Sequence, residues 1–195
     1  MFVIDVETTG PNQFVHDPLA LAIVPLDESG SPFVAYVRTP KQEWSDYAAK
    51  NFRNFKAEWR KQAREPQGVV ADLESYLQER IGPQKAILIG HNVGFDAAFL
   101  KKLAFYCGKD EIAGLSHRTL DTHTLLFAAW KEGKLPESAL SSDGAFEHFG
   151  IEFPDGARHT ALHDALATRA LFQQILKLLS KDARAAAQHF SAGHF

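Results

Sequence analysis

Short apolar runs alternate along this chain with longer segments whose apolar residues recur at helical spacing. The first run, Met1-Phe2-Val3-Ile4, is nearly continuous, as expected for a strand that is covered on both faces. Together the runs predict strands at 1–7, 19–26, 33–38, 86–89 and 118–120. The helical spacings predict helices at 43–64, 69–80, 94–106, 122–131, 139–149 and 161–180. This alternation is typical of an α/β domain.

The boundaries of the domain follow from length and turn composition. Asp27-Glu28-Ser29-Gly30 has the composition of a hairpin turn, so we expect the sheet to begin antiparallel. A chain of 195 residues, 45% of them hydrophobic, fits one domain with one sizeable core. We place that domain at 1–181, followed by an alanine-rich C-terminal tail at 182–195.

Two acids follow the first apolar run. Asp5 and Glu7 are two residues apart on a predicted strand and therefore share one face. The segment 8–11, Thr-Thr-Gly-Pro, then ends the strand, so the pair lies at or just before its exit. Lone carboxylates in such a place would be costly to desolvate, and a bound divalent cation would remove that cost.

Two further segments carry polar groups at helix starts. Asp96 lies in the first turn of the helix predicted at 94–106, where an ordinary helix-start acid is the simpler explanation. Asp164 lies in the early turns of the helix predicted at 161–180, whose apolar stripe includes Leu162 and Leu166. His159 precedes that helix on a predicted loop, where an imidazole near a metal can take a proton from water.

The three segments read DVETTG, HNxxFDxxFL and HxxxxDAxxT. In that order they resemble the three motifs of the DEDDh branch of 3′-to-5′ exonucleases, a branch that includes the proofreading subunit of bacterial replicative polymerase and ribonuclease T. The resemblance spans residues 2 to 172. It implies an RNase H-like fold, a mixed sheet flanked by helices, and a site that holds two Mg²⁺ or Mn²⁺ ions.

Residue by residue, the resemblance implies metal ligation by four acids and the role of general base for His159. The four acids are Asp5, Glu7, Asp96 and Asp164. It also implies substrate contacts at Thr8, Asn92 and Phe95, with the Phe95 ring as the stacking surface for a terminal base. Ordinary helix packing of Phe95 remains an equal alternative.

The chemistry of these groups agrees with the implied roles. Hard divalent ions prefer oxygen ligands, and two ions about 4 Å apart can stabilise both the attacking and the leaving oxygen of phosphodiester cleavage. An imidazole with a reference pKa of about 6.5 can accept a proton near neutral pH. The expected substrate is the 3′ end of single-stranded DNA or RNA, and the sequence does not decide between the two sugars.

The net charge of −3 alone would disfavour a nucleic-acid partner, but the positive charges are concentrated in one segment. Eight lysines and arginines against three acids lie between Arg38 and Arg64, interleaved with aromatic residues. This basic aromatic segment can contact phosphates and bases. Phe52, Phe55 and Trp59 nevertheless have core spacing on a helix, so a solvated basic face over a packed aromatic stripe is favoured.

Two other functions stay open. His159 and His163 are four residues apart, as in a zinc-binding HxxxH pair on one helical face, although Thr160 stands where a zinc protease motif has glutamate. The second alternative is a non-catalytic module that binds nucleic acid or a polymerase. Asp121 resembles a further acid of the family, but we interpret it as a helix N-cap.

Compartment and partners are only weakly indicated. Cys107 is the single cysteine, which fits a reducing compartment, and a small core residue is its simplest interpretation. No run approaches a membrane span, and the N-terminus does not resemble a signal peptide, so a cytoplasmic location is expected. A homodimer and a polymerase partner both remain compatible with the sequence.

Overall fold

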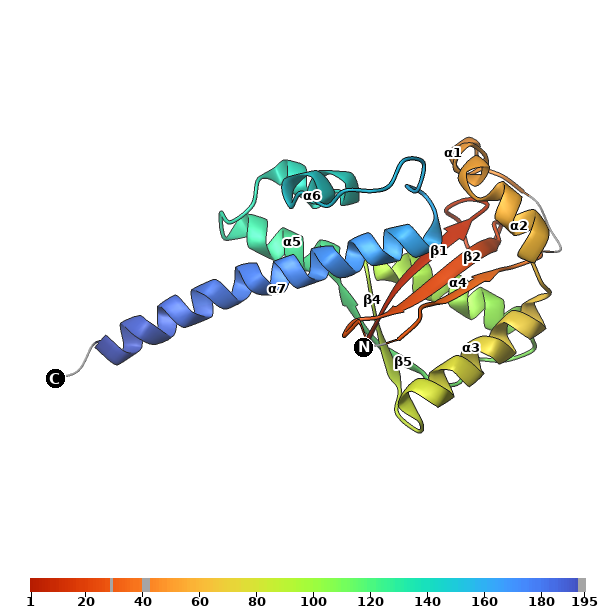
Figure 1. Ribbon diagram of the computed structural model, residues 1–195, viewed down its shortest axis with the longest axis horizontal. Helices are drawn as coiled ribbons and strands as arrows, with labels where there is room; N and C mark the ends of the chain where they lie inside the picture. The colour runs from red at the N-terminus through yellow and green to blue at the C-terminus, as the bar shows by residue number, and fades with distance from the viewer. Residues whose placement is uncertain (29, 40–42, 193–195) are drawn as a thin grey trace.

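A five-stranded mixed sheet forms the centre of the protein in the computed structural model, which describes residues 1–28, 30–39 and 43–192, the last twelve of them by backbone only (Figure 1). The strand order is β3-β2-β1-β4-β5. β1 pairs antiparallel with β2, and β2 with β3, whereas β1 with β4 and β4 with β5 are parallel. The strands are β1 (Phe2–Thr8), β2 (Pro18–Pro25), β3 (Phe33–Tyr36), β4 (Ala86–Gly90) and β5 (Leu115–Asp121).

Helices connect and cover these strands. They are α1 (Asp46–Asn51), η1 (Phe52–Asn54), α2 (Lys56–Gln62), α3 (Pro66–Ile81), α4 (Val93–Tyr106), α5 (Thr122–Lys131), η2 (Glu137–Leu140), α6 (Ser142–His148) and α7 (Ala161–Ala192), where η denotes a 3₁₀ turn. In Figure 1, α7 runs along one face of the sheet, and α3 and α4 lie against the other. The single α/β domain with a mixed sheet is therefore confirmed.

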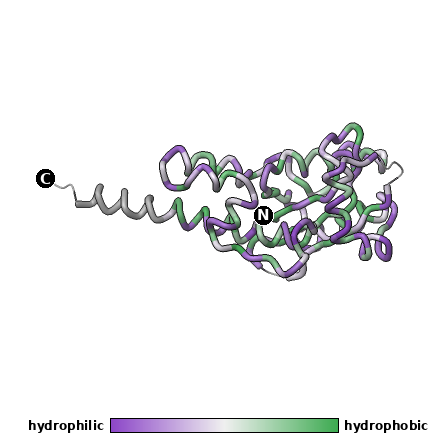
Figure 2. Tube along the Cα trace, turned by 90° about the horizontal axis from the view of Figure 1, so that it is seen from above, coloured by the Kyte–Doolittle hydropathy of each residue, from purple (hydrophilic) through white to green (hydrophobic). Residues whose placement is uncertain are grey.

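Strand β1 is buried on both faces, as its apolar run predicts. Phe2, Ile4 and Val6 join the core under α3 and α4, whereas Val3 joins the core under α7. Figure 2 shows hydrophobic segments running through the interior of the domain. Because side chains alternate along a strand, Asp5 and Glu7 share the face of Val3 and point toward α7.

One predicted helix is wrong. The segment 43–64 divides into α1, η1 and α2, because Phe55 has a φ of −127°, outside the helical range. The bend places the Phe55 ring in the core with 4% of its surface exposed. Phe52 and Trp59 pack on it, and Trp59 Nε1 donates a hydrogen bond to the carbonyl of Val37. Burial of the aromatic stripe thus outweighs helix continuity.

Other boundaries shift less. The segment predicted at 139–149 consists of η2 and α6, separated by Ser141, which is extended and caps α6 through its side chain. The backbone of α7 is helical to Ala192, so helix covers most of the segment predicted as a tail, and 193–195 lie outside the described residues. Ser29 of the predicted turn and Lys41 of the basic segment also lie outside them.

Two smaller expectations can be compared directly. Asp121 is the N-cap of α5, because its side chain accepts a hydrogen bond from the backbone N–H of His123 at 2.9 Å, as interpreted from the sequence. Within the described part of the chain, no helix combines the length and the apolar character that crossing a membrane requires.

Candidate active site

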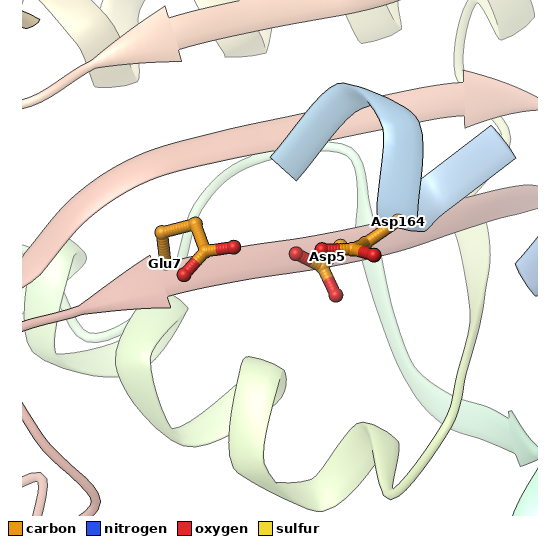
Figure 3. Close-up of side chains that lie close together, drawn as sticks. All are labelled: Asp5, Glu7 and Asp164. Carbon is orange, nitrogen blue, oxygen red and sulfur yellow. The ribbon is translucent and has the colours of Figure 1, made fainter. Parts of the chain in front are cut away.

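Three carboxylates from two elements meet on the α7 face of the sheet. Asp5 and Glu7 come from β1, and Asp164 comes from the first turn of α7 (Figure 3). One oxygen of each lies within 4.8 Å of the corresponding oxygens of the other two. Figure 3 shows the three carboxyl groups pointing toward one another. We call this group the carboxylate trio.

The packing of α7 places Asp164 there. The helix buries a line of small and apolar residues against β1 and β2, including Ala161, Ala165 and Phe172. Asp164 and Thr168 are buried on the same side of the helix. The predicted apolar stripe is confirmed in part, because its members Leu171 and Ile175 are fully buried, whereas Leu162 and Leu166 are only partly buried.

A cavity of about 540 Å³ opens over the trio. Several predicted site residues line it, and they are Asp5, Glu7, Thr8, Phe95, His159 and Asp164. Tyr47, His91 and Arg158 also line it, although the sequence indicated no role at the site for His91 and Arg158 and included Tyr47 only as part of the basic aromatic segment. The cavity therefore collects residues from β1, α1, α4, α7 and the loop before α7.

Burial dominates the electrostatics of the trio, and the crowding of like charges adds to it at Asp5 and Glu7. Burial, followed by the negative charge of Glu7, raises the pKa of Asp5 well above its ordinary value. Burial, followed by the charge of Asp164, raises the pKa of Glu7 to about 7. Burial also raises the pKa of Asp164, although Arg158 acts in the opposite direction. Such a site gains from any cation that neutralises it.

Asp96 adjoins the trio without belonging to it. Its Oδ1 accepts a hydrogen bond of 2.9 Å from the backbone N–H of Val6, which lies beyond the last β1–β4 pair, Val3 with Ile89. The Asp96 carboxylate thus provides a hydrogen-bond acceptor for this N–H at a point where β1 is no longer paired with β4. Burial raises its pKa, and Glu7 contributes in the same direction.

Arg158 is the cation of this site. Its guanidinium donates to Oδ1 of Asp164 and, at 2.6 Å, to Oδ1 of Asp143. It also lies over the rings of Phe146 and Phe153. Burial lowers the pKa of this guanidinium, but the charges and hydrogen bonds of Asp164 and Asp143 together outweigh burial and raise it, so Arg158 stays charged. A loop arginine next to His159 gave no signal in the sequence.

His159 lies at the cavity wall in an uncommon backbone conformation. Its φ is +60°, in the left-handed region that a bulky residue rarely adopts. The neighbouring carbonyl of Arg158 accepts a hydrogen bond of 2.8 Å from Asn54, which helps to hold the loop. Burial, followed by the charge of Arg158, lowers the pKa of His159. The imidazole is therefore neutral at neutral pH and able to accept a proton.

The predicted substrate-contact residues separate into two groups. Thr8 and Phe95 line the cavity, and Phe95 also packs on Phe99 with ring centroids 4.9 Å apart. Asn92 is not among the lining residues, because it is the left-handed N-cap of α4 and its backbone N–H donates to Asp121. Its neighbour His91 lines the cavity instead.

Tyr47 is the aromatic residue of the basic aromatic segment that lines this cavity. Its ring is largely exposed and meets the His159 ring edge-on, with centroids 5.9 Å apart. The other aromatic residues of the segment pack on one another and on the core. This arrangement matches the favoured interpretation of a basic face over a packed aromatic stripe.

The comparisons with known proteins decide the family. A family model described as exonuclease, of the ribonuclease T group, matches residues 2–172. The chain belongs to this exonuclease family. Its mixed sheet flanked by helices is the exonuclease fold.

The relatives of this exonuclease chain include longer proteins. A DNA polymerase III subunit epsilon-like protein from Rhodobacter capsulatus is 35% identical over 94 residues, which are 48% of this chain and 12% of that protein. The zinc-bound complex of E. coli exonuclease I with single-stranded DNA has a TM-score of 0.74 at 20% identity, over 97% of this chain and 42% of that one. Exonuclease I with a dT13 oligonucleotide gives 0.73 at 20% identity, over 96% and 43%. The chain thus spans less than half the length of these proteins.

The geometry weakens the zinc alternative for this exonuclease. Helix α7 begins at Ala161, so His159 and His163 do not share a helical face as an HxxxH pair requires. The ring of His163 instead contacts Thr160 Oγ1 at 2.9 Å. Across the described residues, the carboxylate trio is the only group of three or more ligand side chains gathered closely enough for one metal ion.

Proposed function

We propose that this chain is a DEDDh-type 3′-to-5′ exonuclease that removes nucleotides from single-stranded ends. One observation carries the proposal: the oxygens of Asp5, Glu7 and Asp164 lie within 4.8 Å of one another, in a cavity that His159 also lines. The family match supports the activity, and the relatives named for exonuclease I and polymerase subunit epsilon support the class of substrate.

The donor set fits divalent metal ions. The trio offers hard oxygen ligands, and burial followed by mutual repulsion raises the pKa values of Asp5 and Glu7; a dication would neutralise that charge. We propose that Asp5, Glu7 and Asp164, with Asp96 beside them, hold two Mg²⁺ or Mn²⁺ ions. When bound, such ions stabilise charge on the attacking and leaving oxygens of phosphodiester hydrolysis.

The remaining residues position substrate and move a proton. The neutral His159 imidazole accepts the proton of the attacking water, because its lowered pKa leaves it unprotonated at pH 7. The Phe95 ring offers a stacking surface for the terminal base, which tolerates any base. Thr8, which lines the cavity, is our proposed contact for the terminal nucleotide, whereas Asn92, also expected to contact substrate, is the N-cap of α4 and is not among the lining residues.

Degradation of end-labelled single-stranded DNA and RNA, side by side, tests the proposal. With Mg²⁺ or Mn²⁺, a 5′ label should give a ladder that shortens from the 3′ end, and chelation should abolish it. Zn²⁺ should not restore the chelated enzyme better than Mg²⁺ or Mn²⁺ does. Restoration by Zn²⁺ alone, or binding without cleavage, would favour the zinc hydrolase or the non-catalytic module.

Partners and compartment belong to the same proposal. The similarity to a polymerase subunit epsilon-like protein supports a polymerase as one partner, and a homodimer is the other. Analytical ultracentrifugation of the chain alone distinguishes a dimer from a monomer. A reducing cytoplasmic setting stays our expectation, based on the single cysteine.

A further inference from the structure

Three hollows follow one another across the surface, beginning at the active site. The catalytic cavity shares Pro11 and Phe95 with a neighbouring hollow of about 440 Å³. That hollow shares Phe14 and Ala98 with a third, of about 630 Å³. The three therefore form one continuous path from the carboxylate trio along α4.

Aromatic and basic side chains line the far end of this path. Phe14 is 86% exposed and Phe105 is 76% exposed, and both line the third hollow. Exposed apolar side chains gathered at one place mark a binding surface more often than chance. Lys101 and Lys102 line the same hollow, and no acid is among the described residues that line the second and third hollows.

The helix and the loop present these groups in fixed places. Ala98, Lys101 and Phe105 follow Phe95 on one side of α4, over a length of about 15 Å. Lys102 is not available to a ligand in the same way, because its ammonium binds Asp17 at 2.9 Å. Lys101 has no ion-pair partner among the described residues.

The loop that carries Phe14 is ordered by its own contacts. Asn12 Oδ1 accepts a hydrogen bond of 3.0 Å from the N–H of Phe14, and the N–H groups of Val15 and His16 donate to the carbonyl of Asn12. A side chain at Gly10 would meet the His16 ring at 2.6 Å, so the loop folds closely on itself. These contacts fix the loop backbone while the Phe14 side chain stays exposed to solvent.

We infer that this path binds the uncleaved part of the single strand, with bases stacked on Phe14 and Phe105 and a phosphate near Lys101. Aromatic surfaces beside a cation suit single-stranded nucleic acid, because every base offers a face for stacking and every linkage carries a negative charge. Because the path is continuous with the catalytic cavity, the 3′ end of the strand would lie in that cavity and the upstream nucleotides along α4. The inference rests on the proposed function and extends it from the terminal nucleotide to several upstream ones.

Fluorescence anisotropy in EDTA tests the path without hydrolysis. Fluorescein-labelled oligothymidylates, a trinucleotide and a dodecanucleotide, are titrated with wild type, Phe14→Ala, Phe105→Ala and Lys101→Ala. Each phenylalanine substitution should weaken dodecanucleotide binding roughly 5- to 150-fold, as expected for one stacked base. Lys101→Ala should lower the slope of log affinity against log salt concentration by about 1. Oligouridylates run in parallel distinguish RNA from DNA as the strand.

Phe127→Ala and Lys131→Ala are the matched controls, since both residues lie on α5 away from the path and Phe127 is also exposed. They should bind the dodecanucleotide as wild type does. If Phe14→Ala, Phe105→Ala and Lys101→Ala also bind the dodecanucleotide like wild type, while wild type degrades single strands, the proposed binding path is wrong and the exonuclease assignment stands. If wild type degrades no strand with Mg²⁺ or Mn²⁺, the proposed function itself fails. A concentration-dependent dimer that Phe14→Ala abolishes, with binding unchanged, would make the surface an interface between copies and overturn the inference.

Discussion

At the scale of single residues, the proposed exonuclease function depends on the negative charge of the carboxylate trio. Asp164→Asn removes one negative ligand at nearly constant volume, so the fold should persist while metal affinity falls. The loss should exceed the roughly 10- to 100-fold that removal of an outer-sphere partner typically costs in affinity or activity. Nuclease assays with added Mg²⁺ and isothermal titration with Mg²⁺ measure the two effects separately.

Asp143→Asn is the control for this variant. Asp143 also pairs with Arg158 but is exposed and lies outside the trio. Its substitution should leave Mg²⁺ affinity close to wild type. Digestion of single strands by Asp164→Asn at the wild-type rate would contradict the role of Asp164 as a metal ligand.

The two histidines near the start of α7 allow a second residue-scale prediction. His159→Ala should reduce cleavage about 10²- to 10⁴-fold, as loss of a general base does, and the deficit should shrink as hydroxide becomes available at higher pH. His163→Ala should reduce it far less, because His163 does not line the cavity. Single-turnover cleavage of a short oligonucleotide from pH 6 to 9 compares them. Equal losses would remove His159 from the role of base.

The site residues that could be predicted from the sequence are those whose placement depends only on local structure. Asp5 and Glu7 could be assigned to one face because alternation along a strand is a local property. Arg158 and Tyr47 could not be placed at the site, because nothing local distinguishes a loop arginine or a helix tyrosine at a cavity from one in solvent. Their positions depend on how α1 and the loop before α7 pack on the sheet.

At the scale of elements, hydrophobic periodicity predicted β1, β2 and β4 to within about two residues at each end. It failed over 43–64, where burial of the Phe55 ring bends the backbone. The start of α7 was predicted less well than its middle, since Ala161 and Ala165 are buried against the sheet whereas Leu162 and Leu166 are only partly buried. Periodicity locates elements, whereas tertiary packing decides their bends and rotations.

The loop between β1 and β2 is attached to α4 by a buried ion pair, which gives a prediction at this scale. Asp17 is fully buried, forms an ion pair with Lys102 and accepts a hydrogen bond from the hydroxyl of Tyr106. Lys102→Met should lower the free energy of unfolding by about 3–5 kcal/mol, because it leaves a buried carboxylate without its cation. Urea denaturation followed by circular dichroism measures the change.

Lys61→Met is the comparison for this change, since Lys61 pairs with Glu58 on the exposed side of α2. A surface pair contributes about 0–1 kcal/mol, so this variant should remain close to wild type. Equal destabilisation by the two substitutions would show that the Asp17–Lys102 pair does not attach the loop to α4.

At the scale of the whole molecule, the net charge of −3 conceals an uneven distribution. Three of the 24 acids form the trio, with Asp96 beside it, whereas Lys101 lines the path and Arg53, Lys56 and Arg60 gather in the basic aromatic segment. This distribution keeps the proposed metal ligands together and leaves basic groups elsewhere on the surface to attract phosphate. Net charge alone therefore indicates little about a nucleic-acid partner.

The carboxylate cluster also links global stability to pH and to metal. The pKa of Glu7 is raised to about 7, above its ordinary value of 4.5, so between these pH values the folded protein binds more protons than the unfolded chain. The stability of the metal-free protein should therefore be highest below about pH 4.5 as far as this group is concerned, and fall as pH rises through 7. The raised pKa values of Asp5 and Asp96 act in the same direction.

Mg²⁺ should reverse this trend, because it binds the ionised carboxylates and competes with their protons. At a hundred times its dissociation constant, a ligand stabilises the folded state by about 2.7 kcal/mol, and this gain should be larger at pH 8 than at pH 5.5. Thermal melts across that range, with Mg²⁺ and with EDTA, measure it in wild type and in Glu7→Gln. The variant lacks the titrating group, so its metal-free melting temperature should fall less between the two pH values. If wild type and Glu7→Gln show the same pH dependence in EDTA, the carboxyl of Glu7 is not the group that couples the fold to protons and metal.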